Sequence, residues 1–588
     1  MKNRKFIPII MVGALAGVVA GVIVSKNAHK DVSDFSVSAN TAQMAPVANP
    51  HDKGMVVAAN PLAVEAGVQA LRNGGSAVDA AIAVQTVLSL VEPQSSGVGG
   101  GAFLVYYDAG TGKVSAYNGR ETAPAGIDEN LFVDEDGQPV RRLEGIVSGK
   151  STGVPGVMAM LDMAHDEYGK LAWADNFNYA IKLAEDGFEV SPRMAMLVEM
   201  ASKYALSVQP EARAYFFHED GSPIEAGFVR DNKPYAASLR LIAKDVNNLY
   251  TGELAEKIVA AVHQEPRPGV LTMEDMASYK PIKTEALCSP YKDYIICGAQ
   301  APSSGGIAVQ SIMGQLENFD MRALGPTLDG WHVFAEVSEL AYADRDLYVA
   351  DPDFVTVPTR ELLGVGYLKS RAALITMDSA MQDVKAGDPV SFRPGIDATP
   401  DKKGTSHFSI VDKWGNVVSM TTTVESLFGS ERMTGGFMLN NQLTDFSFRP
   451  RDEAGTLIAN RPQAGKRPRS SMAPHIVFTK DGQFSFATGS PGGSSIIAYT
   501  AKTMIAMIDW DMNPQDATEL ANFISRNGSI RLEEAGMDAA IIEGLEAKGH
   551  KVIRSKGEIS GLHIIKRKAD GSYEGGADPR REGVAIGE

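Results

Sequence analysis

Helical and strand-like patterns of apolar and polar positions alternate along this 588-residue chain. Helical periodicity runs from Pro61 to Gly74, from Ser76 to about Val91, through much of 154–265, and again from about 330. The blocks between and after them predict strands at Phe103–Tyr107, Val114–Tyr117, 405–411, 417–424, 436–440, 474–479 and 484–488. Such alternation predicts a layered α/β body.

The first 24 residues differ from everything that follows. Lys2, Arg4 and Lys5 precede an uncharged run from Phe6 to Val24, which is typical of an export signal. The run is also close to the ~20 residues of a membrane span, so a removed signal peptide (1–24) and a retained N-terminal membrane anchor both stay open. Residues 25–50 are predicted to be a linker. With either a removed signal or a retained anchor, we expect the rest of the chain to be periplasmic or extracellular. That part of the sequence contains no other long apolar run.

The charge balance narrows the range of partners. The formal net charge is -16, which argues against nucleic acid because phosphate binding needs clustered Lys and Arg. The ten histidines show no H-E-x-x-H pair or similar spacing. We therefore expect no metal ion and no cofactor.

Cys288 and Cys297, the only cysteines in the sequence, flank a predicted turn between two strands. Cross-strand residues beside a turn can meet disulfide geometry, and an exported protein permits the bond. Two reduced, buried thiols are the alternative. Neither cysteine has a nearby histidine, so we do not expect a catalytic thiol.

Three glycine-rich stretches imitate known motifs without their structural context. Gly149–Gly153 matches the serine-hydrolase elbow, but Pro155 follows where a helix is required. Gly145–Ser151 has one residue too few for a phosphate loop. Gly97, Gly99 and Ala102 mimic a dinucleotide fingerprint but lead into a strand. We expect loops at all three.

A hairpin after residue 404 carries the strongest chemical signal. If the turn is centred on Trp414, Val411 pairs with Val417, and Thr405 then falls opposite Thr423. Opposed residues have Cβ atoms roughly 4.5–5.5 Å apart, so two hydroxyl groups would meet. Threonine is a good strand former, so the pair alone is weak evidence of function.

Motifs in a fixed order across the chain strengthen this interpretation. The segment Gly404–Asp412 resembles the self-cleavage site of γ-glutamyltransferases. The similarity extends to several further segments in the same order: Gly119–Pro124, Pro302–Gly306, Tyr342–Arg345, Asn440–Phe446, Lys466–Met472 and Thr488–Ser494. Each match is weak by itself, but together they cover nearly the whole chain from about residue 53 to 565.

The resemblance implies a four-layer αββα sandwich of the N-terminal-nucleophile hydrolase type, α/β in class. It also implies self-cleavage between Gly404 and Thr405, giving a heavy chain (51–404) and a light chain (405–588) that share one body. The freed amine of Thr405 would have an ordinary pKa of about 7.7–8.0. It can therefore act as general base for its own hydroxyl.

The resemblance also assigns roles in binding and catalysis. Thr423 would orient the nucleophile, and the backbone N–H groups at Gly492 and Gly493 would form the oxyanion hole. A γ-glutamyl group carries a carboxylate and an ammonium at its α-carbon. The residues expected to bind these two charges are Arg120, Ser470 and Ser471 for the carboxylate, and Glu425, Gln442 and Asp445 for the ammonium.

The implied reaction is cleavage of γ-glutamyl amides such as glutathione, with transfer to water or to an amino acid or peptide acceptor. Two differences from the family pattern leave the identity of the acyl acceptor open. Many relatives have Asn at the position of Glu425, and the loop Arg449–Gly465, which can cover the site, varies among them. One alternative is a glutaryl or cephalosporin-type acylase of the same family, against which Asp445 and Glu425 argue. The other is an unprocessed envelope protein that only binds γ-glutamyl compounds.

Overall fold

The computed structural model describes Met44 and residues 53–399 and 404–588. These residues belong to one compact unit, Ala39–Glu588. The predicted signal or anchor lies outside the described residues, as does all of the linker except Met44. Within the described ranges, every helix is too short or too polar to span a bilayer.

The hairpin that begins at Thr405 lies at the centre of a sheet. Within the described residues, this antiparallel sheet has seven strands. In spatial order they are β20 (Val584–Gly587), β1 (Met55–Ala58), β9 (Ser406–Val411), β10 (Val417–Thr423), β2 (Gly101–Asp108), β3 (Lys113–Gly119) and β6 (Ile282–Glu285).

A second antiparallel sheet packs on the first. Its six strands, counted in the same described part of the chain, are β19 (Tyr573–Ala577), β18 (His563–Arg567), β14 (Phe484–Thr488), β13 (His475–Thr479), β8 (Tyr294–Gly298) and β7 (Leu287–Tyr291). Cys288 and Cys297 are directly opposed on β7 and β8 and form a disulfide bond, which decides between the two alternatives that the sequence left open.

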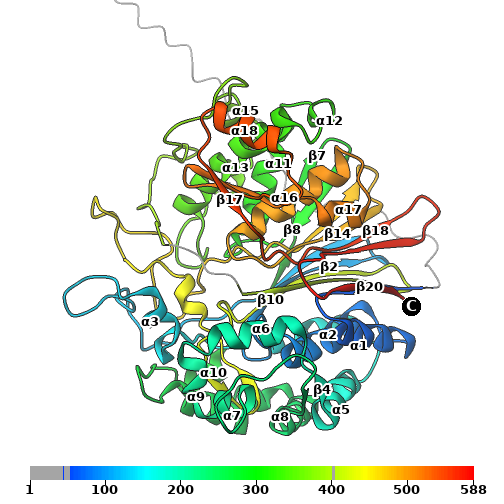
Figure 1. Cartoon of the computed structure of the whole chain (residues 1–588), viewed down its shortest axis with the longest axis vertical. Helices are drawn as coiled ribbons and strands as arrows, with labels where there is room; N and C mark the ends of the chain where they lie inside the picture. The colour runs from blue at the N-terminus through cyan, green and yellow to red at the C-terminus, as the bar shows by residue number, and fades with distance from the viewer. Residues whose placement is uncertain (1–43, 45–52, 400–403) are drawn as a thin grey trace, which may run out of the picture. The chain divides into compact units, whose positions relative to one another are not determined.

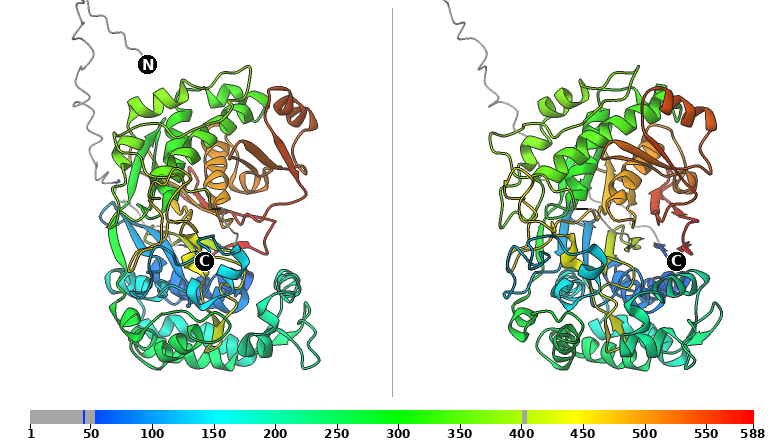
Figure 2. Two further views of the ribbon diagram at one scale, coloured as in Figure 1. Left: turned by 90° about the vertical axis from the view of Figure 1, so that its left-hand side faces the viewer. Right: turned by 60° about the vertical axis from the view of Figure 1, so that its left-hand side comes forward.

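Helices cover the outer face of each sheet (Figure 1), and both views of Figure 2 keep this order of layers. The seven-stranded sheet packs on α1 (Pro61–Arg72), α2 (Ala77–Val91) and α4 (Val157–Tyr168). Further helices extend the same apolar core outward: α5 (Asn178–Asp186), α6 (Pro192–Ala201), α7 (Pro210–Phe216), α8 (Lys233–Lys244), α9 (Glu253–Val262) and α10 (Met273–Ser278).

The six-stranded sheet has its own helical cover. It consists of α11 (Ser304–Leu316), α12 (Met321–Leu324), α13 (Leu328–Tyr348), α15 (Val365–Ala372), α16 (Ser495–Ile508), α17 (Pro514–Glu519) and α18 (Ala539–Ala547), with the small sheet β15 (Phe523–Arg526), β16 (Ser529–Glu533) and β17 (Val552–Ser555). The described chain is thus a four-layer αββα sandwich, as the resemblance implied.

Side-chain alternation along β9 explains how the layers form. Phe408 and Ile410 join the core between the first sheet and its helices. Val411 belongs to the separate apolar core between the two sheets. Since successive side chains of a strand point to opposite faces, Thr405 shares the face of Val411 and lies at the end of the layer between the sheets.

One predicted strand is wrong in extent. We expected a strand over 436–440, but only Phe437–Met438 (β12) is extended, paired with Met433–Thr434 (β11). Asn440 ends the pairing because its side chain bonds the backbone of other segments, donating to the carbonyls of Gly99 and Gly153 at 2.9 Å. This bonding fixes the following turn, which carries Gln442 and Asp445 in a 3-10 helix (Gln442–Asp445).

Candidate active site

The register predicted for the hairpin is confirmed. Val411 pairs with Val417, and the ladder continues to Ser406 opposite Thr422. The next pair is Thr405 and Thr423, whose hydroxyl oxygens lie 3.2 Å apart. Both residues are buried, so the two hydroxyl groups face each other away from bulk water.

The carbonyl group of Gly404 lies against both hydroxyls. Thr423 donates to this oxygen at 2.6 Å and accepts the N–H of Glu425 at 2.8 Å, while the Thr405 hydroxyl also contacts the carbonyl. A Cβ atom at position 404 would lie 2.6 Å from the carbonyl oxygen of Glu425. Glycine is therefore required here because the backbone of the neighbouring turn approaches so closely.

The loop before α16 has a backbone that favours glycine. Gly492 has φ 138° and Gly493 has φ 61°, and a Cβ at Gly492 would lie 2.6 Å from the Tyr499 ring. Gly493 and Ser494 line the same cavity as Thr405. Backbone N–H groups at the start of a helix favour negative charge, so this loop can stabilise an oxyanion.

Arg120, which is buried, and Asp445, whose side chain is 18% exposed, form an ion pair through Nη2 and Oδ2. Arg120 also donates to the carbonyls of Pro468 at 3.0 Å and Arg469 at 2.8 Å. Gln442 donates to the same Asp445 oxygen at 2.8 Å. These bonds hold a cation and an anion side by side, as recognition of an α-carboxylate and α-ammonium requires.

Glu425 is the second acid of the site, and it is buried. Its backbone is in the left-handed region, with φ 81°, and its carboxylate accepts from Ser426 and Asn441. Arg142 lies 3.5 Å from Oε1. Burial, together with the charge of Asp445, raises the pKa of Glu425 to about 7.

Ser470 and Ser471 also line this cavity. The Ser470 backbone is held by Pro302 and Ser304, with the Ser304 N–H donating to the Ser470 carbonyl at 2.7 Å. Arg345 donates to the Ser471 hydroxyl and, through Nε, to Ser304 at 2.9 Å. The motifs at 302–306 and 342–345 therefore position the double serine.

Nearly all of the predicted site residues surround one cavity of about 30 Å³. Its lining includes Thr405, Thr423, Arg120, Glu425, Gln442, Asp445, Ser470, Ser471 and Gly493. Gly404 and Gly492 are adjacent in sequence to lining residues and are not themselves part of the lining.

Sequence reasoning missed three arginines of this region. Arg345 and Arg469 line the cavity, and Arg142 pairs with Glu425. Arg345 and Arg469 lie within two of the motifs that resemble the γ-glutamyltransferases, so the sequence did contain a signal for these two arginines. Arg142 lies 283 positions from Glu425 and had no sequence signal.

The serine-elbow match at Gly149–Gly153 is a 3-10 turn, Gly149–Ser151. The Ser151 hydroxyl is buried and donates to the carbonyls of Ile146 at 2.9 Å and Ser148 at 2.7 Å. It is a structural serine, as the missing helix predicted.

An αββα sandwich with a Gly–Thr bond at the end of the layer between its sheets defines the class of N-terminal-nucleophile hydrolases. Within that class, the family model described as gamma-glutamyltranspeptidase matches residues 63–588. The chain belongs to this gamma-glutamyltranspeptidase family.

Individual relatives support the assignment. The chain is 36% identical to the glutathione hydrolase proenzyme of Bacillus subtilis (strain 168) over 547 residues, 91% of each chain. It is also 36% identical to the glutathione hydrolase proenzyme of Escherichia coli (strain K12) over 538 residues, 90% of each. The crystal structure of cephalosporin acylase from Bacillus halodurans has a TM-score of 0.80 at 26% identity, covering 91% of this chain and 96% of that one.

Proposed function

We propose that this chain is a glutathione hydrolase and γ-glutamyltransferase that cleaves itself between Gly404 and Thr405 and then uses Thr405 as its nucleophile. The observation that carries the proposal is the meeting of two hydroxyls and the Gly404 carbonyl beside a largely buried pair of opposite charges. Heavy chain 51–404 and light chain 405–588 would remain in one body.

The first step is self-cleavage. The Thr405 hydroxyl oxygen bonds to the carbonyl carbon of Gly404, and the hydrogen bond from Thr423 stabilises the charge that develops on the carbonyl oxygen. The C–N bond between Gly404 and Thr405 breaks, and the Thr405 nitrogen takes the proton that the hydroxyl group has lost. Water then hydrolyses the ester, leaving a carboxylate at Gly404 and a free amine at Thr405.

The second reaction uses the freed groups. The Thr405 amine removes the hydroxyl proton, the oxygen attacks the γ-glutamyl carbonyl, and the leaving amine departs with that proton. N–H groups at Gly492 and Gly493 stabilise the oxyanion. Water, an amino acid or a peptide then accepts the acyl group. A cavity of about 30 Å³ is too small for a γ-glutamyl group, so substrate binding follows the departure of Gly404.

Substrate recognition rests on the α-carbon of the γ-glutamyl group. Arg120, with the hydroxyls of Ser470 and Ser471, takes the carboxylate. Asp445, Gln442 and Glu425 take the ammonium. The export-like segment 1–24 supports a periplasmic or extracellular location for this chemistry, either as a released or as an anchored enzyme.

An acylase of the same family is the second candidate, favoured by the structural similarity to cephalosporin acylase. A glutaryl group lacks the ammonium, however, so Asp445 and Glu425 would face an apolar methylene. We expect γ-glutamyl-p-nitroanilide to be turned over at least about 30-fold faster than glutaryl-p-nitroanilide, because leaving a buried charge without its partner costs about 2–5 kcal/mol. Equal or reversed rates would favour the acylase.

The pH dependence of substrate affinity tests Glu425. Since its pKa is raised to about 7, the carboxyl is largely neutral at pH 6 and ionised at pH 8, and only the ionised form attracts an ammonium. We expect KM for γ-glutamyl-p-nitroanilide to rise several-fold, up to about tenfold, as pH falls from 8 to 6. Glu425→Gln should flatten this dependence of KM while leaving the kcat profile, set by the Thr405 amine, in place. The exposed Glu453→Gln variant serves as control and should match the wild type.

A further inference from the structure

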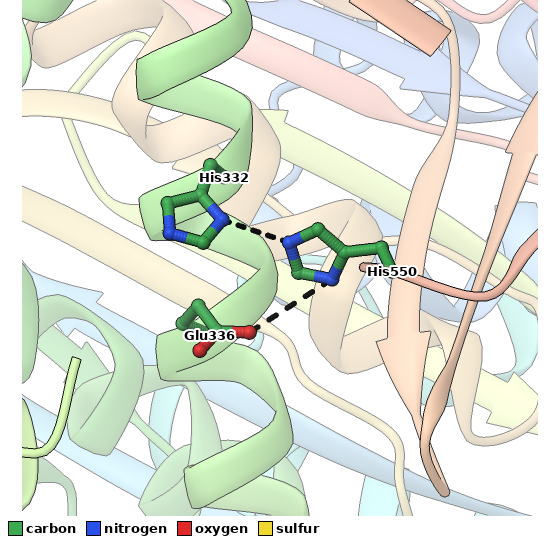
Figure 3. Close-up of side chains that lie close together, drawn as sticks. All are labelled: His332, Glu336 and His550. Atoms are coloured by element: carbon green, nitrogen blue, oxygen red, sulfur yellow. Dashed lines mark hydrogen bonds and ion pairs between the residues drawn. The ribbon is translucent and has the colours of Figure 1, made fainter. Parts of the chain in front are cut away.

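Two histidines and a glutamate meet among the helices that cover the six-stranded sheet (Figure 3). His332 and Glu336 lie one turn apart on α13, and His550 lies in the loop between α18 and β17. His332 is fully buried, Glu336 is 1% exposed, and the His550 side chain is 6% exposed. One ligand atom from each residue lies within 4.8 Å of the others.

The hydrogen bonds of His332 fix its tautomer. Its Nε2 lies 2.7 Å from the carbonyl oxygen of Thr376, which can only accept, so Nε2 carries the proton. A neutral ring then has a lone pair on Nδ1. That atom lies 2.8 Å from Nε2 of His550, so the lone pair is directed at the second ring.

The other side of His550 faces a carboxyl group. Its Nδ1 lies 3.8 Å from Oε1 of Glu336, whose Oε2 accepts the N–H of Met381 at 2.9 Å. With its proton on Nε2, His550 donates a hydrogen bond to His332 Nδ1 across 2.8 Å. With its proton on Nδ1, both facing nitrogens offer a lone pair to a cation, and a Glu336 oxygen is close enough to be a third ligand.

The surrounding charges are compatible with a bound cation. The nearby positively charged side chain is Lys548. Its ammonium group forms an ion pair with Asp329 at 3.2 Å and donates a hydrogen bond to the carbonyl of Met377.

We propose that His332, Glu336 and His550 form a binding site for a divalent transition metal ion, zinc being the best match. Two imidazoles and one carboxylate, with water in the fourth position, are a common ligand set for tetrahedral zinc. The Thr376 carbonyl then acts as the outer partner that holds His332 in the ligating tautomer.

Only a small rearrangement is needed. Nitrogen atoms bound to one tetrahedral zinc ion lie roughly 3.3 Å apart, so the rings must separate by about half an ångström. His550 can supply this movement because it lies in a loop, and its partial exposure gives the ion a path from solvent. The histidine spacing predicted no metal site because His550 lies 218 positions from His332.

The site would also join the two products of self-cleavage. His332 and Glu336 precede Gly404, whereas His550 follows Thr405. If the proposed cleavage occurs, a bound ion links heavy and light chains without touching the nucleophile. This consequence rests on the proposed function, but metal binding itself does not.

The test is metal binding to the tag-free, full-length protein and to its uncleaved Thr405→Ala variant. After treatment with a chelator and dialysis against ZnCl2, we expect one zinc per chain in both proteins, measured by atomic emission. Cobalt(II) should give the visible absorption of a tetrahedral site. Failure of cleavage would leave this result unchanged, which separates the two proposals.

Substitutions of single residues test which side chains bind the metal ion. His550→Gln and Glu336→Gln should each weaken zinc binding more than about tenfold, whereas His218→Gln, a partly exposed histidine paired with Glu225, should bind like the wild type. Saturating zinc should raise Tm by about 2 °C or more in the wild type and not in His550→Gln. Absence of stoichiometric zinc, or equal zinc in the wild type and both substituted proteins, would overturn the proposal.

Discussion

Thr405→Ala should leave the protein as a single uncleaved polypeptide on a denaturing gel, where the wild type gives two bands. The substitution removes the oxygen that attacks Gly404, so neither the ester nor the free amine can form. Turnover of γ-glutamyl-p-nitroanilide should fall by more than ~10³-fold, since loss of a nucleophile in comparable enzymes costs up to ~10⁶ in kcat.

Thr405→Ser is the matched control, because it keeps both the hydroxyl and the potential amine. It should still give two bands, and N-terminal sequencing of the small band should begin at residue 405. Two bands from Thr405→Ala would refute the self-cleavage mechanism. A single band from the wild type over days would instead support the unprocessed binding protein.

Asp445→Asn should lower kcat/KM for γ-glutamyl-p-nitroanilide by about 10²–10³-fold. The neutral amide no longer attracts the substrate ammonium, and it removes the ion pair that Asp445 makes with the buried Arg120. Removing one member of a buried, hydrogen-bonded charge pair costs about 2–5 kcal/mol, or about 30- to 5,000-fold, and the partial exposure of Asp445 places the expected loss below the upper end of this range.

The glutaryl substrate distinguishes the two causes. If Asp445 binds the ammonium, the loss should be much smaller for glutaryl-p-nitroanilide, which has none. An equal loss for both substrates would mean that Asp445 acts only by holding Arg120. Glu453→Gln, which removes an exposed carboxylate from the nearby loop, should change neither rate.

The hairpin illustrates what could be predicted from sequence. Its register follows from the alternation of side chains and the position of one turn, both of which are local properties. The pairing of Val411 with Val417 then fixed the position of Thr405 opposite Thr423 without knowledge of the rest of the fold. The prediction of a strand over 436–440 was wrong in extent because the conformation there depends on distant residues: the Asn440 side chain donates to the backbone carbonyls of Gly99 and Gly153.

The sequence by itself determined the family resemblance, the layered class of fold, and the glycine–threonine bond with its opposing hydroxyl. The tertiary structure decided which charges face each other. Arg120 meets Asp445 across 325 positions, Arg142 meets Glu425 across 283, and His332 meets His550 across 218. Local backbone pairing is specified by neighbouring residues, whereas electrostatic partners, and the burial that raises the pKa of Glu425, arise only when the layers pack together.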